Sequence, residues 1–337
     1  MVNRKVALLR ADASLSIGVG HVMRSISLGE ALVAEGFRVE FVSFNLAQGL
    51  NDIATGSGLT VVELDCEPFG RQDAEFVLER AADVSVIDGY EFSREFFAVL
   101  ESGVCKFAVI DDNVETKALS PTLVINQNPH AVASMYGHLI GNPTLLLGLQ
   151  YALIRREVRE YAKTNQRVSD GSVFVAMGGS DFLGLTAPLV RELAQLGRVV
   201  RVAVGHTNPR RAEVAATAAE FGNVELIDQS QYVASLAKAD IAVLAAGSSL
   251  WEAAALGVPT LALIVADNQQ ALARHAGSIG LVQLMECRPN LDLDKLMTIL
   301  SDCFESDNSV MSQIARRTVD ENGALRVAEL LMATASH

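Results

Sequence analysis

The feature that most constrains the fold is a series of short, continuously apolar segments separated by longer stretches of helical character. Strands that are apolar on both sides are typical of parallel sheets, because helices cover both faces of such a sheet. The first half of the chain therefore predicts a doubly wound parallel sheet. The strands expected there are residues 5–9, 38–43, 84–87 and 107–110.

The same pattern restarts after a polar segment, residues 161–171, which we interpret as a linker. A second doubly wound sheet is expected beyond it, with helices between its strands. The predicted strands of this sheet are residues 173–177, 199–204, 224–227, 241–244 and 260–265.

We thus predict an α/β fold with two Rossmann-like domains facing a cleft. The chain has 337 residues, about twice the ~100 to 200 residues of one ordinary domain. The expected organisation is an N-terminal α/β domain over residues 1–160, a C-terminal α/β domain over residues 161–307 and a helical tail over residues 308–337. Because ligands of open parallel sheets lie beyond the carboxyl ends of the strands, chemistry is expected in the residues that follow each strand.

Composition excludes several classes of protein. Half of the residues are hydrophobic and 20% are charged, so disorder is not expected. The longest apolar stretch, residues 258–266, falls short of the ~20 residues that span a bilayer, and Arg10 and Asp12 interrupt the N-terminal run, so neither a membrane span nor a signal peptide is predicted. A net charge of −13 argues against a nucleic-acid surface. The four cysteines are scattered, which suits a reducing compartment, and we expect a cytoplasmic monomer or weak oligomer.

A glycine-containing loop after the first strand carries a candidate general base. Gly18 and Gly20 allow backbone amides to approach a ligand closely, and His21 stands at the start of the following helix. Met23 occupies the place of the third glycine of a dinucleotide fingerprint, and no acidic residue ends the second strand, so NAD binding is rejected. The helix dipole disfavours an imidazolium here, which favours a neutral base. The alternative is a histidine that caps the helix or packs locally.

Three carboxylates and a phenol follow the predicted strands at residues 84–87 and 107–110, at the same sheet edge as His21. They belong to Asp88, Tyr90, Asp111 and Asp112. One interpretation is that a carboxylate orients the imidazole of His21; the other is that the acids cap helices and turns, which we favour for Asp111 and Asp112. For Tyr90, wall packing and hydrogen bonding to a substrate both stay open.

In the second half, two loops resemble sites for a phosphate group. Residues 178–181 follow a strand and are expected to open a helix, and residues 247–252 repeat the arrangement. Glu252 is suited to accept hydrogen bonds from ribose hydroxyls; the alternative is a capping box of Ser249 and Glu252. Asn268 and Gln269 follow another strand and either meet a sugar or cap a helix. The histidines have no metal-ligand spacing, and no P-loop or serine-hydrolase motif occurs.

Several of these motifs occur in an order and spacing that belong to a known family. The chain resembles the UDP-sugar hydrolases of pseudaminic acid biosynthesis, in the glycosyltransferase B-like superfamily. The resemblance runs from the first strand to about residue 281 and implies a two-domain glycosyltransferase B fold similar to that of MurG. The motifs are Ile17-Gly-Val-Gly-His-Val-Met-Arg24, Asp88-Gly-Tyr90, Asp111-Asp112, Tyr151-Ala-Leu-Ile-Arg155, Gly178-Gly-Ser-Asp181, Ser248-Ser-Leu-Trp-Glu252 and Asn268-Gln269.

The resemblance implies roles for individual residues. His21 would be the catalytic histidine, with Tyr90 and Asn268 in the active site, and the C-terminal domain would hold most of the nucleotide. The chain departs from the family at Gly89, where histidine is frequent, and at Trp251, and both departures bear on sugar preference. The residues expected to bind substrate or nucleotide are Gly18, Gly20, Arg24, Asp88, Gly178, Gly179, Ser180, Asp181, Gly247, Ser248, Ser249, Leu250, Glu252 and Gln269.

The residues and the resemblance predict the same reaction. His21 takes a proton from water, the water attacks the anomeric carbon of UDP-2,4-diacetamido-2,4,6-trideoxy-β-L-altrose, and UDP leaves with its charge met by helix-start amides. Neither metal nor cofactor is expected, and attack from the opposite face predicts inversion. Two alternatives stay open: a transferase of the same fold that activates an acceptor hydroxyl, and a nucleotide-sugar-binding module without turnover. In each case the expected partner is a UDP-sugar.

Overall fold

The computed structural model describes residues 4–14, 18–103, 105–164, 167–179, 181–205 and 208–336. The chain forms two compact units, and each is considered by itself. The first unit consists of Met1–Arg156 together with Asn322–His337, and the second of Glu157–Glu321. No helix among the described residues is long and apolar enough to cross a membrane.

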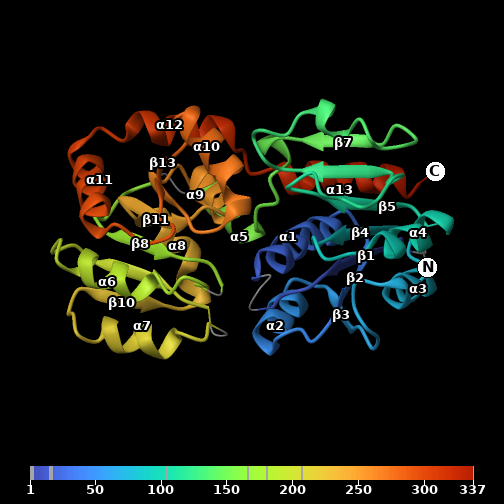
Figure 1. The fold of residues 1–337 in the computed structure, drawn as a ribbon, viewed down its shortest axis with the longest axis horizontal. Coiled ribbons are helices and arrows are strands. Elements are labelled where there is room, and N and C mark those ends of the chain that lie inside the picture. The colour runs from blue at the N-terminus through green and yellow to red at the C-terminus, as the bar shows by residue number, and fades with distance from the viewer. Residues whose placement is uncertain are drawn as a thin grey trace. The chain divides into compact units, whose positions relative to one another are not determined.

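The first unit is built on a seven-stranded, all-parallel sheet in the order β3-β2-β1-β4-β5-β6-β7 (Figure 1). The chain leaves β1 toward β2 and returns to β4 on the other side of β1, so the strand order reverses between these two strands. Such a switch point leaves room for a ligand at the carboxyl ends of the strands. The strands are β1 Val6–Ala11, β2 Arg38–Ser43, β3 Thr60–Glu63, β4 Val84–Asp88, β5 Phe107–Ile110, β6 Leu123–Asn126 and β7 Thr144–Leu147.

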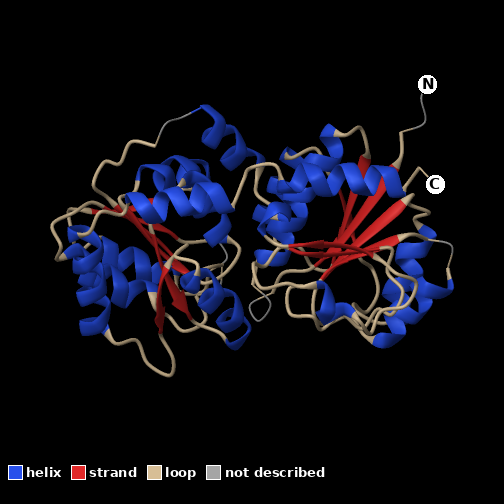
Figure 2. Ribbon diagram, turned by 90° about the horizontal axis from the view of Figure 1, so that it is seen from above, coloured by secondary structure: helices blue, strands red, loops and turns tan. Residues whose placement is uncertain are grey.

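Helices cover both faces of this sheet (Figure 2). Side chains alternate along β1, so that Ala7 and Leu9 pack with α1, α2 and α13, whereas Leu8 packs with α3 and α4. The predicted doubly wound parallel sheet is thus confirmed. The helices are α1 Gly20–Ala34, α2 Gln48–Gly56, α3 Arg71–Glu79, α4 Arg94–Ser102 and α13 Gly323–Thr334, with short 3-10 turns at η1 Ala133–Tyr136 and η2 Leu149–Tyr151.

The second unit has a six-stranded, all-parallel sheet in the order β10-β9-β8-β11-β12-β13. One of its faces packs against α6, α7 and α11, and α9 and α10 pack against the other. The strands are β8 Val173–Ala176, β9 Val200–Ala203, β10 Val224–Ile227, β11 Ile241–Ala245, β12 Thr260–Ile264 and β13 Gln283–Glu286. The helices are α5 Arg156–Thr164, α6 Thr186–Ala194, α7 Arg211–Ala218, α8 Tyr232–Lys238, α9 Ser249–Leu256, α10 Gln270–Ser278, α11 Leu293–Glu305 and α12 Ser309–Thr318, with 3-10 turns at η3 Gln229–Gln231 and η4 Asp267–Gln269.

The C-terminal segment differs from the single helical tail expected over residues 308–337. Helix α12 belongs to the second unit, whereas α13 belongs to the first, so the chain passes between the units twice. The reason is the apolar stripe of α13: Val327, Ala328 and Leu331 are fully buried in the core that α1 shares with the sheet. At the start of α13, a Cβ on Gly323 would lie 2.3 Å from the carbonyl oxygen of Ala152, so only glycine fits there.

Shortening Leu331 to alanine should therefore destabilise the first unit, even though the residue stands near the end of the chain. Loss of a fully buried leucine typically lowers the free energy of unfolding by ~2–5 kcal/mol. We expect an effect of this size for Leu331→Ala, measured by urea unfolding followed by far-UV circular dichroism. Glu329→Ala, on the exposed side of the same helix, should change the value by less than ~0.5 kcal/mol. Equal effects of the two substitutions would contradict the packing of α13.

Candidate active site

The candidate site lies at the switch point of the first sheet, where β1, β4 and β5 end. His21 is the second residue of α1, Asp88 is the last residue of β4, and Asp112 follows β5. These elements bring side chains together that are far apart in the sequence, because the carboxyl ends of parallel strands share one edge. Figure 1 shows α1 and β4 adjacent in the first unit.

The central contact is a hydrogen bond between His21 and Asp88. The Nδ1 atom of His21 lies 2.6 Å from Oδ1 of Asp88. Burial acts to raise the pKa of the Asp88 carboxyl, but the charges of Arg24 and His21 outweigh it and hold the pKa well below its usual range. An ionised Asp88 only accepts hydrogen bonds, so the contact assigns the proton to Nδ1 of the imidazole. In its neutral form the ring then carries its lone pair on Nε2.

Arg24 fixes Asp88 from the other side. It stands three residues after His21, on the same face of α1, and its Nε donates to Oδ2 of Asp88 at 2.7 Å. Its Nη1 pairs with the carboxylate of Asp112, and its Nη2 lies 3.0 Å from Nδ1 of His21. Arg24 is 5% exposed and is held by protein carboxylates.

These contacts correct the expectation that Arg24 and Asp88 bind substrate directly. Asp88 is 1% exposed and accepts from His21, Arg24 and, at 3.1 Å, from the hydroxyl of Ser25. Its oxygens are therefore used inside the protein. Both residues act on the imidazole rather than on a ligand. Asp88 thus orients His21, which is the first of the two interpretations given for the acids at the strand ends.

Tyr90 packs against His21. The two rings meet edge to face, with centroids 4.7 Å apart and an angle of 82° between their planes. Burial, with the charge of Asp112, raises the pKa of the Tyr90 phenol well above its usual value. The hydroxyl therefore keeps its proton and is a donor, 3.5 Å from Oδ2 of Asp112. The ring contact fits the wall-packing interpretation of Tyr90. Hydrogen bonding of its hydroxyl to a substrate stays a prediction.

Asp111 and Asp112 differ from each other. The Oδ1 atom of Asp111 accepts from the backbone amide of Glu115 at 2.9 Å, which is the turn capping we favoured. For Asp112 that interpretation is wrong, because its carboxylate pairs with Arg24 instead. Within the described part of the chain, one oxygen of each carboxylate, Oδ2 of Asp111 and Oδ1 of Asp112, is buried without a hydrogen-bond partner.

A second buried cluster, which the sequence did not reveal, supports the ends of the strands. Arg10 on β1 is 0% exposed, donates to Asp73 through Nε at 2.9 Å and lies over the adjacent rings of Phe69 and Phe92. Its Nη1 is 2.7 Å from Oδ1 of Asp12. The signal was present as a charged residue inside an apolar strand, where the side chain must be paired to be buried. Gly89 lies beside this cluster, and a Cβ there would come within 2.9 Å of the Phe92 ring.

The first glycine loop of the second unit is built differently from the expectation. Helix α6 begins at Thr186, so residues 178–181 do not open it. Instead, Asp181 is 3% exposed, and its carboxylate accepts from the backbone amides of Leu185 at 2.8 Å and of Thr186 at 3.0 Å. Asp181 thus caps α6 rather than binding a nucleotide, a correction to its expected role. Gly178 has φ +78°, a conformation that favours glycine. Ser180 lies outside the described residues.

The second loop leads directly into α9. Ser248 is the N-cap residue and makes no capping hydrogen bond with its side chain, and Ser249 is already helical, so a capping box of Ser249 and Glu252 is not formed. Glu252 is partly buried in the first turn. Leu250 is fully buried, and its amide donates to the carbonyl of Gly247, so its side chain is not available to a ligand, which corrects its expected role.

After β12, the two residues expected to meet a sugar, Asn268 and Gln269, have different surroundings. Oε1 of Gln269 accepts from the backbone amide of Val265 at 3.0 Å and closes the turn after β12. Gln269 is the N-cap residue of α10, but its side chain makes no capping hydrogen bond, so the helix-capping interpretation is wrong for it. Asn268 is exposed in η4. Nearby, Asp267 and Arg288 form an ion pair. Among the described residues, no group of three histidine, cysteine or acidic side chains is arranged to hold a metal ion.

Comparison with known proteins places this geometry in context. No family model matches the chain. It is 28% identical over 277 residues, covering 81% of the chain and 96% of the relative, to the UDP-2,4-diacetamido-2,4,6-trideoxy-beta-L-altropyranose hydrolase of Campylobacter jejuni subsp. jejuni serotype O:2. The chain is a relative of this hydrolase. It is also 28% identical over 334 residues, 95% of the chain and 96% of the relative, to the spore coat polysaccharide biosynthesis protein SpsG of Bacillus subtilis.

Solved structures confirm the fold. MurG of Acinetobacter baumannii matches 98% of the chain over its whole length with a TM-score of 0.64 and 14% identity. The spinosyn rhamnosyltransferase SpnG, complexed with thymidine diphosphate, matches 99% of the chain over its whole length with a TM-score of 0.66 and 16% identity. At these identities the likeness concerns the architecture, and the chain has the glycosyltransferase B fold that the sequence motifs implied.

The His21–Asp88 contact can be tested by the position of the imidazole proton. At a pH where the ring is neutral, long-range ¹H–¹⁵N spectra of the wild-type protein should show the proton of His21 on Nδ1. In Asp88→Asn the amide can donate to Nδ1, so the proton should move to Nε2. Asp111→Asn, which neutralises another carboxylate of the same sheet edge, should leave the Nδ1–H form in place. An unchanged His21 spectrum in Asp88→Asn would contradict the contact.

The low pKa of Asp88 also predicts how acid changes stability. In the wild type, its ionised form stabilises the fold above the ordinary aspartate pKa of ~3.9, and this contribution is lost as the pH falls toward the lower folded pKa. Arg24→Gln removes the main charge that opposes burial, so the folded pKa of Asp88 rises. The stability advantage of the wild type over Arg24→Gln should thus be largest near neutral pH and shrink in acid.

Urea unfolding at about pH 7 and about pH 2.5 measures this difference, because the lower value lies below the unfolded aspartate pKa. The control is Arg71→Gln, in which an exposed arginine loses its exposed glutamate partners. Such surface pairs contribute little to stability, so the control should show no comparable pH dependence. A constant difference between wild type and Arg24→Gln at both pH values would refute the assigned electrostatics.

Proposed function

We propose that the protein hydrolyses a UDP-linked 2,4-diacetamido-2,4,6-trideoxy sugar of the L-altrose type at its anomeric carbon, with inversion, and releases UDP and the free sugar for nonulosonic (pseudaminic) acid synthesis. The observation that carries the proposal is the hydrogen bond from His21 Nδ1 to Asp88, which leaves Nε2 as a base. The similarity to the Campylobacter hydrolase of UDP-2,4-diacetamido-2,4,6-trideoxy-beta-L-altropyranose supports the choice of substrate.

The first step is proton transfer to His21. Nε2 takes a proton from water while the water oxygen forms a bond to the anomeric carbon. The imidazolium that develops is stabilised by the ionised Asp88, already hydrogen-bonded to Nδ1. Arg24 holds Asp88 in place through two nitrogen atoms, so the carboxylate needs no rearrangement during the step. The bond from the anomeric carbon to the β-phosphate oxygen breaks, and UDP takes the electron pair.

The second unit is proposed to hold the nucleotide through the loops after β8 and β11. A Cβ placed on Gly178 or Gly247 would meet no atom within 4 Å, so both loops are open to a ligand. The side chain of Ser248 does not cap α9. The amides of Leu250 and Trp251 donate to the carbonyls of Gly247 and Ser248, so the proposed phosphate donors are the amides of Ser248 and Ser249 at the start of the helix. Glu252 in the same turn is suited to the ribose hydroxyls. The proposal includes no metal and no cofactor.

Tyr90 and Asn268 complete the proposed active site. The Tyr90 hydroxyl is protonated and lies next to the imidazole, where it can donate to a sugar oxygen. Asn268 is exposed after β12 and offers an amide to the sugar. Gly18 has φ +79° and open space around it, which leaves the backbone of the His21 loop accessible.

The proposal is tested by incubating the protein with UDP-linked diacetamido sugars in the absence of an acceptor, with anomeric proton NMR as the readout. We expect UDP and free sugar in equal amounts, with the inverted anomer appearing first. His21→Ala should lower kcat by ~10² to 10⁴-fold, the usual contribution of a positioned base. His138→Ala, a change of the same type at an exposed histidine of the first unit, should leave kcat unchanged.

Other outcomes overturn the proposal. Turnover only after an acceptor is added would identify a transferase. UDP binding without turnover in either condition would identify a nucleotide-sugar-binding module. Full activity of His21→Ala would exclude His21 as the base, whatever the substrate.

A further inference from the structure

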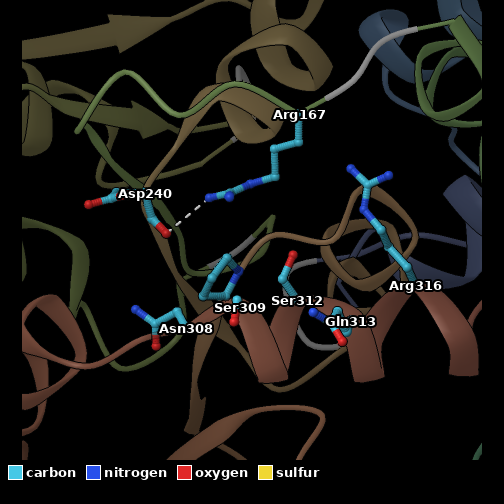
Figure 3. Close-up of a pocket in the computed structure, with 8 residues that line it drawn as sticks. Arg167, Asp240, Asn308, Ser309, Ser312, Gln313 and Arg316 are labelled. Atoms are coloured by element: carbon cyan, nitrogen blue, oxygen red, sulfur yellow. Dashed lines mark hydrogen bonds between the residues drawn. The ribbon is translucent and has the colours of Figure 1, made fainter.

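A cavity of about 490 Å³ lies at the edge of the second sheet opposite to the glycine loops. Asp240 and Pro259 line it, and they directly precede β11 and β12. The loops proposed for the nucleotide follow β8 and β11 and therefore lie at the other ends of the strands. Figure 3 shows the side chain of Arg167 directed toward Asp240, and Arg316 on α12 with its guanidinium on the same side of that helix. The cavity is thus separate from the proposed active site.

Arg167 brings an incompletely paired guanidinium to this cavity. Its Nη2 donates to the backbone carbonyls of Ala239 at 2.6 Å and Asp240 at 3.2 Å. Its Nε is buried and, within the described residues, has no hydrogen-bond partner. A buried N–H that makes no hydrogen bond is costly, so the group is suited to an acceptor supplied from outside the chain.

Arg316 supplies a second guanidinium from α12. Its Nη2 donates to the carbonyl of Leu256 at 3.0 Å, at the C-terminus of α9. The next residue, Gly257, has φ +68°, and a Cβ there would lie 2.2 Å from Nε of Arg316. This glycine therefore allows the arginine to lie close against the end of α9. In the described part of the chain, neither Arg167 nor Arg316 forms a salt bridge with a carboxylate.

The nearby acids are engaged elsewhere. The carboxylate of Asp240 accepts from the hydroxyl of Ser169 at 2.8 Å and pairs with Arg198 at 3.3 Å. Asp307 accepts from the amide of Ser309 and so caps α12. Burial lowers the pKa of Arg167, and the charge of Arg316 lowers it further against the opposing effect of Asp240. The two guanidiniums repel each other across the cavity.

We propose that this cavity binds a small molecule through a phosphate group held between Arg167 and Arg316. Guanidinium N–H groups form strong, charge-assisted hydrogen bonds to phosphate oxygens. A phosphate placed between the two arginines removes their repulsion, and its several oxygens can accept from N–H groups of both guanidiniums at once. The side-chain amide of Gln313, in the cavity lining, offers a further donor. The volume lies within the ~300–1,000 Å³ of small-molecule sites.

Calorimetric titration of the full chain with inorganic phosphate tests the site. We expect saturable binding by the wild type. Arg316→Gln should weaken it at least tenfold. The matched control, Arg317→Gln, removes the same charge from the adjacent position of α12, which points to a different side of the helix, and should weaken binding less than twofold. Gln313→Glu retains both arginines and their protein contacts but adds a carboxylate to the cavity, and should weaken binding at least fivefold.

Three results would overturn the proposal. The first is no saturable binding by the wild type. The second is equal weakening by Arg316→Gln and Arg317→Gln, which would show a general effect of charge. The third is phosphate binding that persists in Arg316→Gln and Gln313→Glu, which would locate the phosphate elsewhere in the molecule. A parallel titration with malonate distinguishes a phosphate ligand from a carboxylate ligand. If malonate binds as tightly as phosphate and responds to the variants in the same way, the ligand group is a carboxylate and not a phosphate.

Discussion

The site depends on one buried carboxylate. Asp88 ends a central strand with almost no exposure, and an isolated charge there would be strongly unfavourable. The chain compensates by surrounding it with His21, Arg24 and Ser25, all on the first turns of α1. This links the end of β4 to the start of the helix that follows β1, the two places where the sheet topology diverges. The same contacts that make the charge tolerable also determine which nitrogen of the imidazole is available for chemistry.

Much of the fold could be predicted from the sequence because central parallel strands are buried on both faces and therefore read as apolar runs. The strands that were missed are β3, β6, β7 and β13. Three of them lie at sheet edges, where polar residues such as Glu63 and Gln283 are tolerated, and β6 is a four-residue strand between long loops. The sequence also did not show which sheet α13 packs against, because an apolar stripe indicates that a helix is packed but not on which sheet.

The sequence predicted which residues of the candidate site come close together, but not which of them form hydrogen bonds with one another. That His21, Asp88 and Tyr90 meet follows from their places after adjacent strands of one sheet. Which carboxylate would face the imidazole did not follow, because a place after a strand does not give the direction of a side chain, and both Asp88 and Asp112 pair with Arg24. The pairing of Arg10 with Asp73 joins a strand to a helix far along the chain, and no local spacing signals such a contact. Likewise, Asp181 looks like part of a phosphate loop in the sequence and proves to cap a helix that starts later than expected.

The return of the chain into the first unit affects how the protein is made. Residues 157–321 leave the ribosome before α13 does, so the second unit has its complete set of strands and helices at a time when the first still lacks the helix that packs on α1. The unit whose sheet is synthesised first is therefore completed last, because it still lacks α13. During that interval the apolar face of α1 is uncovered on the nascent polypeptide, and it offers the kind of surface to which chaperones bind.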